Sequence, residues 1–154
     1  MKKLTNTFFF VVILSVLLVA CKKDDNVATS MATIEITVVN VGFSSWKVVS
    51  VTNSSNTAVL ETNNTPFTFE KDRRYKIVSM AAATIHPFEL RNTSNGVLIS
   101  QSEGSMGNLE SNVSINFVRD ANGISFTTSS SFTSAVSTYN CANHNGMRGN
   151  VVVR

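Results

Sequence analysis

A thiol, an imidazole and a thioether stand close together near the C-terminus, at Cys141, His144 and Met147. They lie in the stretch TYNCANHNGMRGNVVV with the spacing Cys-x2-His-x2-Met, and a short apolar segment follows. Thiolate, imidazole and thioether groups are the softer ligands that a protein offers to a transition metal. The spacing therefore predicts a metal site built largely from one short loop, and a fourth ligand must come from elsewhere.

The chain has two histidines, and the candidate for the fourth ligand is therefore the other one, His86. It alternates with Phe88 and Leu90, so on a β-strand its side chain points inward with theirs. A buried histidine that bonds only to backbone is the ordinary alternative. Beside a Cys-His-Met loop, however, two imidazoles, one thiolate and one weak thioether make up the ligand set of blue copper sites. We therefore predict that His86, Cys141, His144 and Met147 bind one copper ion.

Cysteine use agrees with this prediction, because the chain has only one other cysteine, Cys21. Residues 1–20 carry two lysines and then an apolar run that ends in a small residue, which is the pattern of a secretory signal peptide. The alternative is an uncleaved transmembrane helix, but the run from 8 to 20 is short for a span of about 20 residues. A lone thiol in an exported protein calls for a role, and coordination to a metal would protect it.

The residues Leu18-Val19-Ala20-Cys21 resemble the bacterial lipobox. The resemblance implies cleavage before Cys21 and lipidation of its thiol. Residues 21–32 are charged, then small and polar, and are expected to be a flexible tether to a domain at 33–154. The protein is thus expected to be exported and anchored to a membrane, most simply the outer membrane, facing the periplasm or the cell surface.

The charge balance excludes one broad class of partner. Of the thirteen lysines and arginines, Lys2 and Lys3 leave with the signal peptide, so that eleven remain against ten acidic residues. Because the mature part is nearly neutral and has no basic stripe, nucleic-acid binding is not expected. Near neutrality also argues against strong electrostatic steering of a partner.

The residues after 32 predict an all-β domain. Short segments of alternating polarity are separated by clusters of Asn, Ser, Thr and Gly, which is typical of a β-sandwich or barrel. The expected strands lie at 33–41, 46–52, 66–70, 73–79, 86–92, 96–100, 112–118, 123–128 and 149–154. The segment 129–138 is expected to form a helical turn or a loop, and no long helical pattern follows the leader.

Two stretches resemble the cupredoxins, the plastocyanin-like blue copper proteins. Residues 66–92 resemble the family's strand, turn, strand and first-ligand segment. Residues 124–153 resemble its closing segment, where a Tyr two residues before the Cys leads into Cys, His, Met, Gly and the last strand. The resemblance implies a Greek-key β-sandwich, a trigonal plane of two imidazoles and a thiolate, a weak axial thioether, and electron transfer.

One residue departs from the family pattern. In plastocyanin and azurin the residue after the first histidine donates its backbone N–H to the Cys sulfur, but here that residue is Pro87, which has no N–H. Since such a hydrogen bond favours the electron-rich reduced site, its loss is expected to lower the reduction potential.

The resemblance also implies how electrons enter and leave. In cupredoxins the histidine of the C-terminal loop reaches the surface through an apolar patch, so a redox protein is expected to dock near His144. The candidate neighbours in this sequence are Gly42, Phe43, Ala81 to Ala83, Met106 and Gly146. No small-molecule substrate is expected.

Other functions fit the sequence less well. Zinc would prefer a further Cys or His to Met147. Neither Cys-x-x-Cys-His nor Cys-x-x-Cys is present, and both histidines are already assigned, so covalent haem, thiol exchange and a catalytic triad are not supported. Four protein ligands leave no open metal position for catalysis, so the protein is not expected to be an enzyme. Copper delivery or buffering is the second candidate, and a metal-free sandwich for adhesion or carbohydrate contact is the third.

Overall fold

The computed structural model describes residues 31–154. The signal peptide at 1–20, the lipidation site Cys21 and nearly all of the tether at 21–32 lie outside the described residues. Within the described part, no helix has the length and apolar character needed to cross a membrane.

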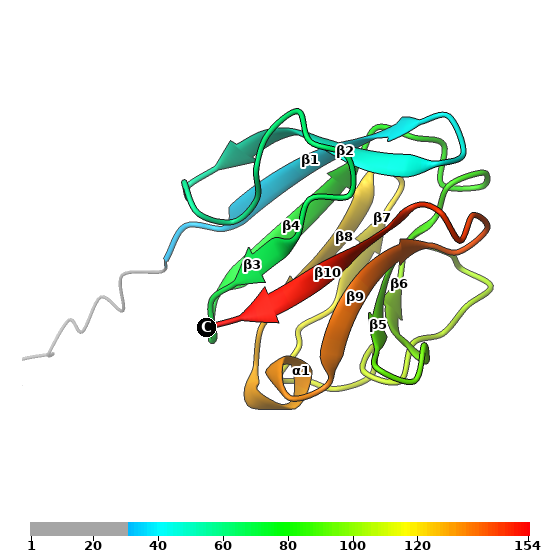
Figure 1. The fold of residues 1–154 in the computed structure, drawn as a ribbon. Coiled ribbons are helices and arrows are strands. Elements are labelled where there is room, and N and C mark those ends of the chain that lie inside the picture. The colour runs from blue at the N-terminus through cyan, green and yellow to red at the C-terminus, as the bar shows by residue number, and fades with distance from the viewer. Residues whose placement is uncertain (1–30) are drawn as a thin grey trace, which may run out of the picture. The chain divides into compact units, whose positions relative to one another are not determined.

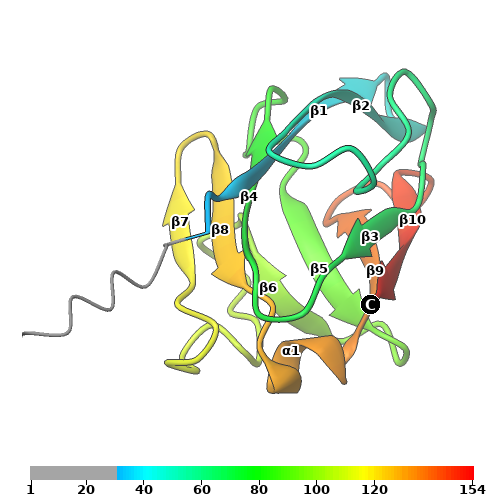
Figure 2. The same ribbon diagram turned by 90° about the vertical axis from the view of Figure 1, so that its left-hand side faces the viewer.

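Two five-stranded sheets face each other, and Figures 1 and 2 show them from two sides. In order across the first sheet are β2 (Ser45–Thr52), β1 (Ile34–Val41), β4 (Arg74–Ser79), β8 (Gly123–Thr127) and β7 (Val118–Asp120). The second contains β3 (Phe67–Phe69), β10 (Arg148–Val153), β9 (Val136–Cys141), β5 (Phe88–Asn92) and β6 (Val97–Ser100). A single turn of helix, α1 (Ser130–Thr133), precedes β9. The prediction of an all-β sandwich is confirmed.

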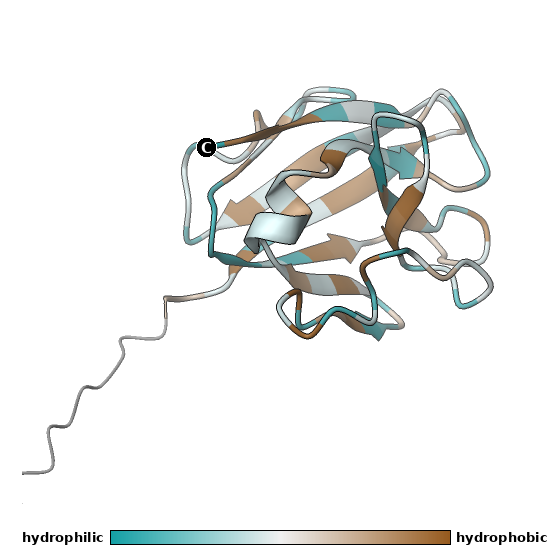
Figure 3. Ribbon diagram, turned by 90° about the horizontal axis from the view of Figure 1, so that it is seen from below, coloured by the Kyte–Doolittle hydropathy of each residue, from teal (hydrophilic) through white to brown (hydrophobic). Residues whose placement is uncertain are grey.

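The strands form where apolar side chains alternate. In β1 the side chains of Ile34, Ile36 and Val38 are buried, and in β4 those of Tyr75 and Ile77 are buried. Their neighbours in sequence are less buried, as expected for side chains on the opposite face of a strand. Figure 3 shows alternating bands of hydrophobic and hydrophilic residues along the strands. This period of two is what holds each strand in register on its sheet.

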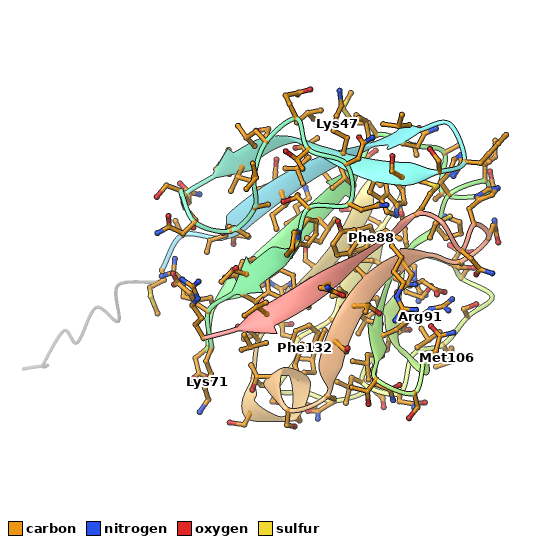
Figure 4. The ribbon with its side chains drawn as sticks, viewed as in Figure 1. Lys47, Lys71, Phe88, Arg91, Met106 and Phe132 are labelled. Carbon is orange, nitrogen blue, oxygen red and sulfur yellow. The ribbon has the colours of Figure 1, made fainter. Side chains whose placement is uncertain are left out.

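Stacked aromatic rings fill the space between the sheets. Phe67 stacks on Tyr139 with ring centroids 4.1 Å apart, and Phe69 continues the contact to Tyr75. Phe88 and Phe132 are both fully buried, and Figure 4 places them between the sheets, whereas Lys47 and Lys71 point outward. Each fully buried phenylalanine stabilises the fold by about 1.5–3 kcal/mol through burial of apolar surface. The core therefore gives the strand ends a rigid support.

Two of the strand predictions were wrong. Residues 112–117 lie outside the strands and include a turn at 113–115, and only Val118 belongs to a strand, as the first residue of β7. The Asn112 side chain accepts a hydrogen bond from the Ser114 N–H and Asn116 has a φ of 47°, both of which favour turns over a strand. Conversely, 136–141 is the strand β9, although 129–138 was expected to be a helical turn or a loop. The last four residues of β9 are all buried, so they show no alternation of polarity from which a strand could be predicted.

His86 also lies outside a strand, contrary to the prediction for 86–92. Strand β5 begins at Phe88, and the N–H of His86 donates to the Ala82 carbonyl in the turn before it. Pro87 has no N–H to contribute to a ladder at this point, so the strand starts one residue later. The His86 side chain is nevertheless buried, at 5% exposure.

Three connections lie at one end of the sandwich, on the right in Figure 1. They are the turn at 42–44 between β1 and β2, the loop at 80–87 before β5, and the loop at 142–147 between β9 and β10. The candidate metal ligands lie in or beside these connections.

Candidate metal centre

The pairing of β5 with β9 brings His86 beside Cys141. Phe88, the first residue of β5, is the partner of Cys141, the last residue of β9. The ladder continues for one more step, because the N–H of Ala142 donates to the Pro87 carbonyl over 2.9 Å. His86 therefore lies just before the chain enters the sheet at β5, next to the residues that follow Cys141.

The loop after Cys141 folds back on itself and brings in the other two candidates. The N–H of Met147 donates to the His144 carbonyl over 3.1 Å, and the N–H of Cys141 donates to the Met147 carbonyl over 2.9 Å. These two bonds close a tight turn at the start of β10. Cys141 and Met147 are both buried, at 2% and 0% exposure.

Three ligand atoms converge at this point. The Nδ1 atoms of His86 and His144 lie 3.8 Å and 3.4 Å from the Cys141 sulfur, and the ligand atoms of the three residues all lie within 4.8 Å of one another. A metal ion with bonds of about 2.3 Å to sulfur and about 2.0–2.1 Å to nitrogen would hold such atoms about 3.6–3.8 Å apart at tetrahedral or trigonal angles. The donor set and its spacing therefore fit one transition-metal ion with little movement.

Met147 belongs to the same loop and is part of the hydrophobic core together with Cys141. Its side chain is thus in contact with other protein groups and not with solvent. The structure brings all four sequence-predicted residues to one end of the sandwich, with three of them in direct contact through their ligand atoms.

The pKa shifts of Cys141 and His86 favour the neutral forms of both groups when no metal is bound. Burial raises the pKa of the Cys141 thiol, while hydrogen bonds from the backbone N–H groups of Asn143 and His144 oppose the rise. Burial lowers the pKa of His86, and the nearby His144 lowers it further. His86 is therefore held as the neutral imidazole that can bind a metal, and Cys141 loses its proton when a metal binds.

The expectation that the missing Pro87 N–H lowers the reduction potential stays a prediction. Pro87 donates nothing to the sulfur, as its chemistry requires, but the sulfur accepts hydrogen bonds from Asn143 and His144 of its own loop. The Arg91 guanidinium also lowers the pKa of this thiol, whereas the Glu89 carboxylate raises it.

An asparagine links the two ligand-bearing segments. The side-chain amide of Asn143 donates to the Ile85 carbonyl over 2.9 Å, directly before His86. Because Asn143 lies between Cys141 and His144, this bond fixes the distance between the two loops. Nothing in the sequence pattern of Asn143 pointed to this role.

Two aromatic rings surround the histidines. Phe43 stacks on His144 and His86 with ring centroids 4.8 Å and 5.6 Å apart, although its own side chain is 67% exposed. Trp46 packs edge-on against His86 at 6.2 Å from the inner side. Phe43 was among the predicted neighbours of His144, whereas Trp46 was not recognised because it reads as an ordinary core residue of a strand.

The other predicted neighbours differ in position. Gly146 lies against the backbone of Ser44, and the Ala82 carbonyl accepts the His86 N–H. Met106 is exposed and lies in the connection after β6 (Figure 4).

Comparisons with known proteins give a fold-level likeness. No family model matches the chain, and no curated protein matches it. Two solved structures of the copper protein rusticyanin are similar, one of them of the reduced protein. The first has a TM-score of 0.42 at 11% identity and covers 79% of this chain and 78% of its own. The second has a TM-score of 0.41 at 12% identity and covers 79% of each chain.

The described part of the chain is an all-β sandwich of two sheets with a His-Cys-His cluster at one end, which is the architecture that its resemblance to the cupredoxins implies.

Proposed function

We propose that the protein is a blue copper electron carrier with His86, Cys141, His144 and Met147 as ligands. The observation that carries the proposal is that the ligand atoms of His86, Cys141 and His144 lie within 4.8 Å of one another at one end of the sandwich. A bound copper ion would supply a one-electron couple between Cu(II) and Cu(I).

The protein residues would prepare the site for that couple. Cys141 supplies the thiolate, and the N–H groups of Asn143 and His144 stabilise its negative charge. His86 and His144 supply imidazole nitrogens, and Met147 supplies a weaker thioether. Because the strand ends and the bond from Asn143 fix these groups, they are expected to move little when an electron arrives.

Burial of the donors favours electron transfer over copper delivery. His86, Cys141 and Met147 are all buried, so an acceptor protein or chelator cannot reach these three donors directly. His144 is only partly buried, so one donor alone is open to ligand exchange, whereas a site that hands over its metal would expose more of them. Four protein donors also leave no position for a substrate, and on this ground we place the protein among electron carriers rather than enzymes.

We propose that a redox partner docks over Phe43. This exposed ring stacks on His144, and the exposed side chain of Ile85 lies next to His86 in the adjoining loop. Between such a partner and the His144 ring would lie only the Phe43 ring, whose centroid is 4.8 Å from that of His144. The contact would be small and apolar, because the mature chain is nearly neutral.

We also propose that lipidation at Cys21 tethers the domain to a membrane outside the cytoplasm. The lipobox-like residues before Cys21 support this proposal. Fractionation of cells that express the wild type and Cys21→Ser tests it. The wild type is expected in the membrane fraction and the variant outside it, and equal distribution of the two would contradict the anchor.

A redox titration separates electron transfer from copper delivery. The copper-loaded protein should take up one electron per copper and give it back, with copper retained in both states. Cys141→Ser is the control, and it should show no such couple. Release of the copper on reduction would instead favour delivery or buffering.

A further inference from the structure

Asn64, in the connection between β2 and β3, makes three hydrogen bonds next to the candidate metal centre. Its backbone N–H donates to the Trp46 carbonyl over 2.7 Å, and its side-chain oxygen accepts the Trp46 N–H over 3.0 Å. Its side-chain amide then donates to the Gly146 carbonyl over 3.0 Å, across 82 positions of sequence. A φ of 50° turns the residue toward both partners, in a region of backbone conformation that asparagine tolerates well.

The next residue adds a second link to the site. The carbonyl of Thr65 accepts the phenol O–H of Tyr139 over 2.7 Å, and Tyr139 lies two residues before Cys141 in β9. Both groups are buried, so this bond is shielded from water. The Tyr139 ring reaches Thr65 by passing over Gly149 of β10, where any side chain would overlap it.

The partners of these two residues are all neighbours of candidate ligands. Trp46 packs against His86, Gly146 lies between His144 and Met147, and Tyr139 leads into Cys141. The connection between β2 and β3 contains no candidate ligand. Its hydrogen bonds nevertheless reach a neighbour of a candidate ligand in each of the three ligand-bearing segments.

We propose that Asn64 and Thr65 form a brace that fixes the 142–147 loop in its ligand-binding conformation before any metal binds. Asn64 is the positioning residue that can be tested, since its amide is the one side-chain bond from the brace to the loop. The meaning of that conformation for copper rests on the proposed function, but the positioning of the loop does not.

Asn64→Asp tests the brace with little other change. An aspartate tolerates the same φ and still accepts the Trp46 N–H, but it cannot donate to Gly146 and places a carboxylate oxygen against that carbonyl. Asn53→Asp is the matched control, because Asn53 has a φ of 60° and its amide donates to the Thr33 carbonyl over 2.7 Å, beyond the far end of β2 from Trp46.

Amide hydrogen exchange in the copper-free protein reports the loop directly. The N–H groups of Cys141 and Met147, which close the turn, are expected to exchange about fivefold faster in Asn64→Asp and at the wild-type rate in Asn53→Asp. If Asn64→Asp does not fold, Asn64→Gly keeps the positive φ and removes both side-chain bonds, and the same acceleration is expected. Wild-type exchange at both amides in the folded Asn64 variant would overturn the brace.

Copper release to a chelator provides the second measurement. Release is expected to be faster in the Asn64 variant than in the wild type and in Asn53→Asp, because a loosened loop frees its donors more often. If the wild type binds no copper, the proposed function fails, and the exchange rates of the copper-free protein still decide whether the brace exists.

Discussion

Replacement of Gly149 by alanine tests whether the packing behind the candidate site is as tight as the structure indicates. A Cβ at Gly149 would overlap the Tyr139 ring. The ring cannot move aside easily, because it stacks on Phe67 at 4.1 Å and on Phe88 at 5.7 Å and its O–H is bound to the Thr65 carbonyl. One added methyl group must therefore displace either an aromatic stack or a strand.

The cost can be estimated from two terms. Overpacking of a core typically costs about 1–3 kcal/mol. Displacement of the ring also weakens a buried hydrogen bond worth about 1 kcal/mol. We expect Gly149→Ala to lower the free energy of unfolding by about 2–4 kcal/mol, which corresponds to a melting temperature about 10 °C lower for a domain of this size.

Denaturant unfolding of the copper-free protein, followed by the fluorescence of the single tryptophan, measures this change. Gly104→Ala is the control, because the nearest atom to a Cβ there is the Ser102 oxygen at 3.9 Å, an ordinary contact. The control is expected to stay within about 0.5 kcal/mol of the wild type. If Gly149→Ala is no less stable than Gly104→Ala, the packing of Tyr139 described above is incorrect.

Three further predictions concern the metal itself. Pro87→Ala introduces an N–H beside Cys141 and should raise the reduction potential in voltammetry, since a further hydrogen bond favours the reduced site; a lower or unchanged potential would mean that no such bond forms. Because the pKa of the Cys141 thiol is raised, copper binding must release the proton of this thiol. The apparent affinity for copper, measured in a chelator competition, should therefore increase about tenfold per pH unit between about pH 7 and 9. An affinity that does not change with pH would show that the thiol is not a ligand. Trp46 packs against His86, so its emission should be strongly quenched by one equivalent of Cu(II), whereas equal emission with and without copper would place the metal elsewhere.

The sequence was sufficient to predict most of the sandwich. Segments such as 34–41 and 74–79 alternate apolar and polar residues, and this alternation indicates a β-strand with one buried face. The ligand loop could also be recognised, because Cys141, His144 and Met147 lie within seven residues.

Other features depend on contacts between distant residues. Strand β9 is buried on both faces at its end and therefore has no alternating pattern. The turn conformation within 112–117 depends on local asparagine side chains rather than on the pattern of polarity. His86 faces Cys141 because Phe88 pairs with Cys141, and this register is set only when the two strands meet.

The residues that support the site could not be found from sequence. Asn64 and Asn143 belong to a chain rich in asparagine, and neither has a distinctive spacing to a ligand. Their roles arise from bonds to backbone carbonyls at Gly146 and Ile85, which any residue provides equally well. Because every residue has a backbone carbonyl, the residue type at the accepting position does not reveal such a bond.

The visible spectrum of the protein tests the central claim most directly. The purified protein is mixed with Cu(II), excess metal is removed, and the absorption is recorded for the wild type and for Cys141→Ser. We predict an intense blue band in the wild type that disappears on reduction, returns on oxidation and is absent from the variant. A colourless protein that retains no copper would contradict the account, and copper bound without the intense band would show that Cys141 is not its ligand.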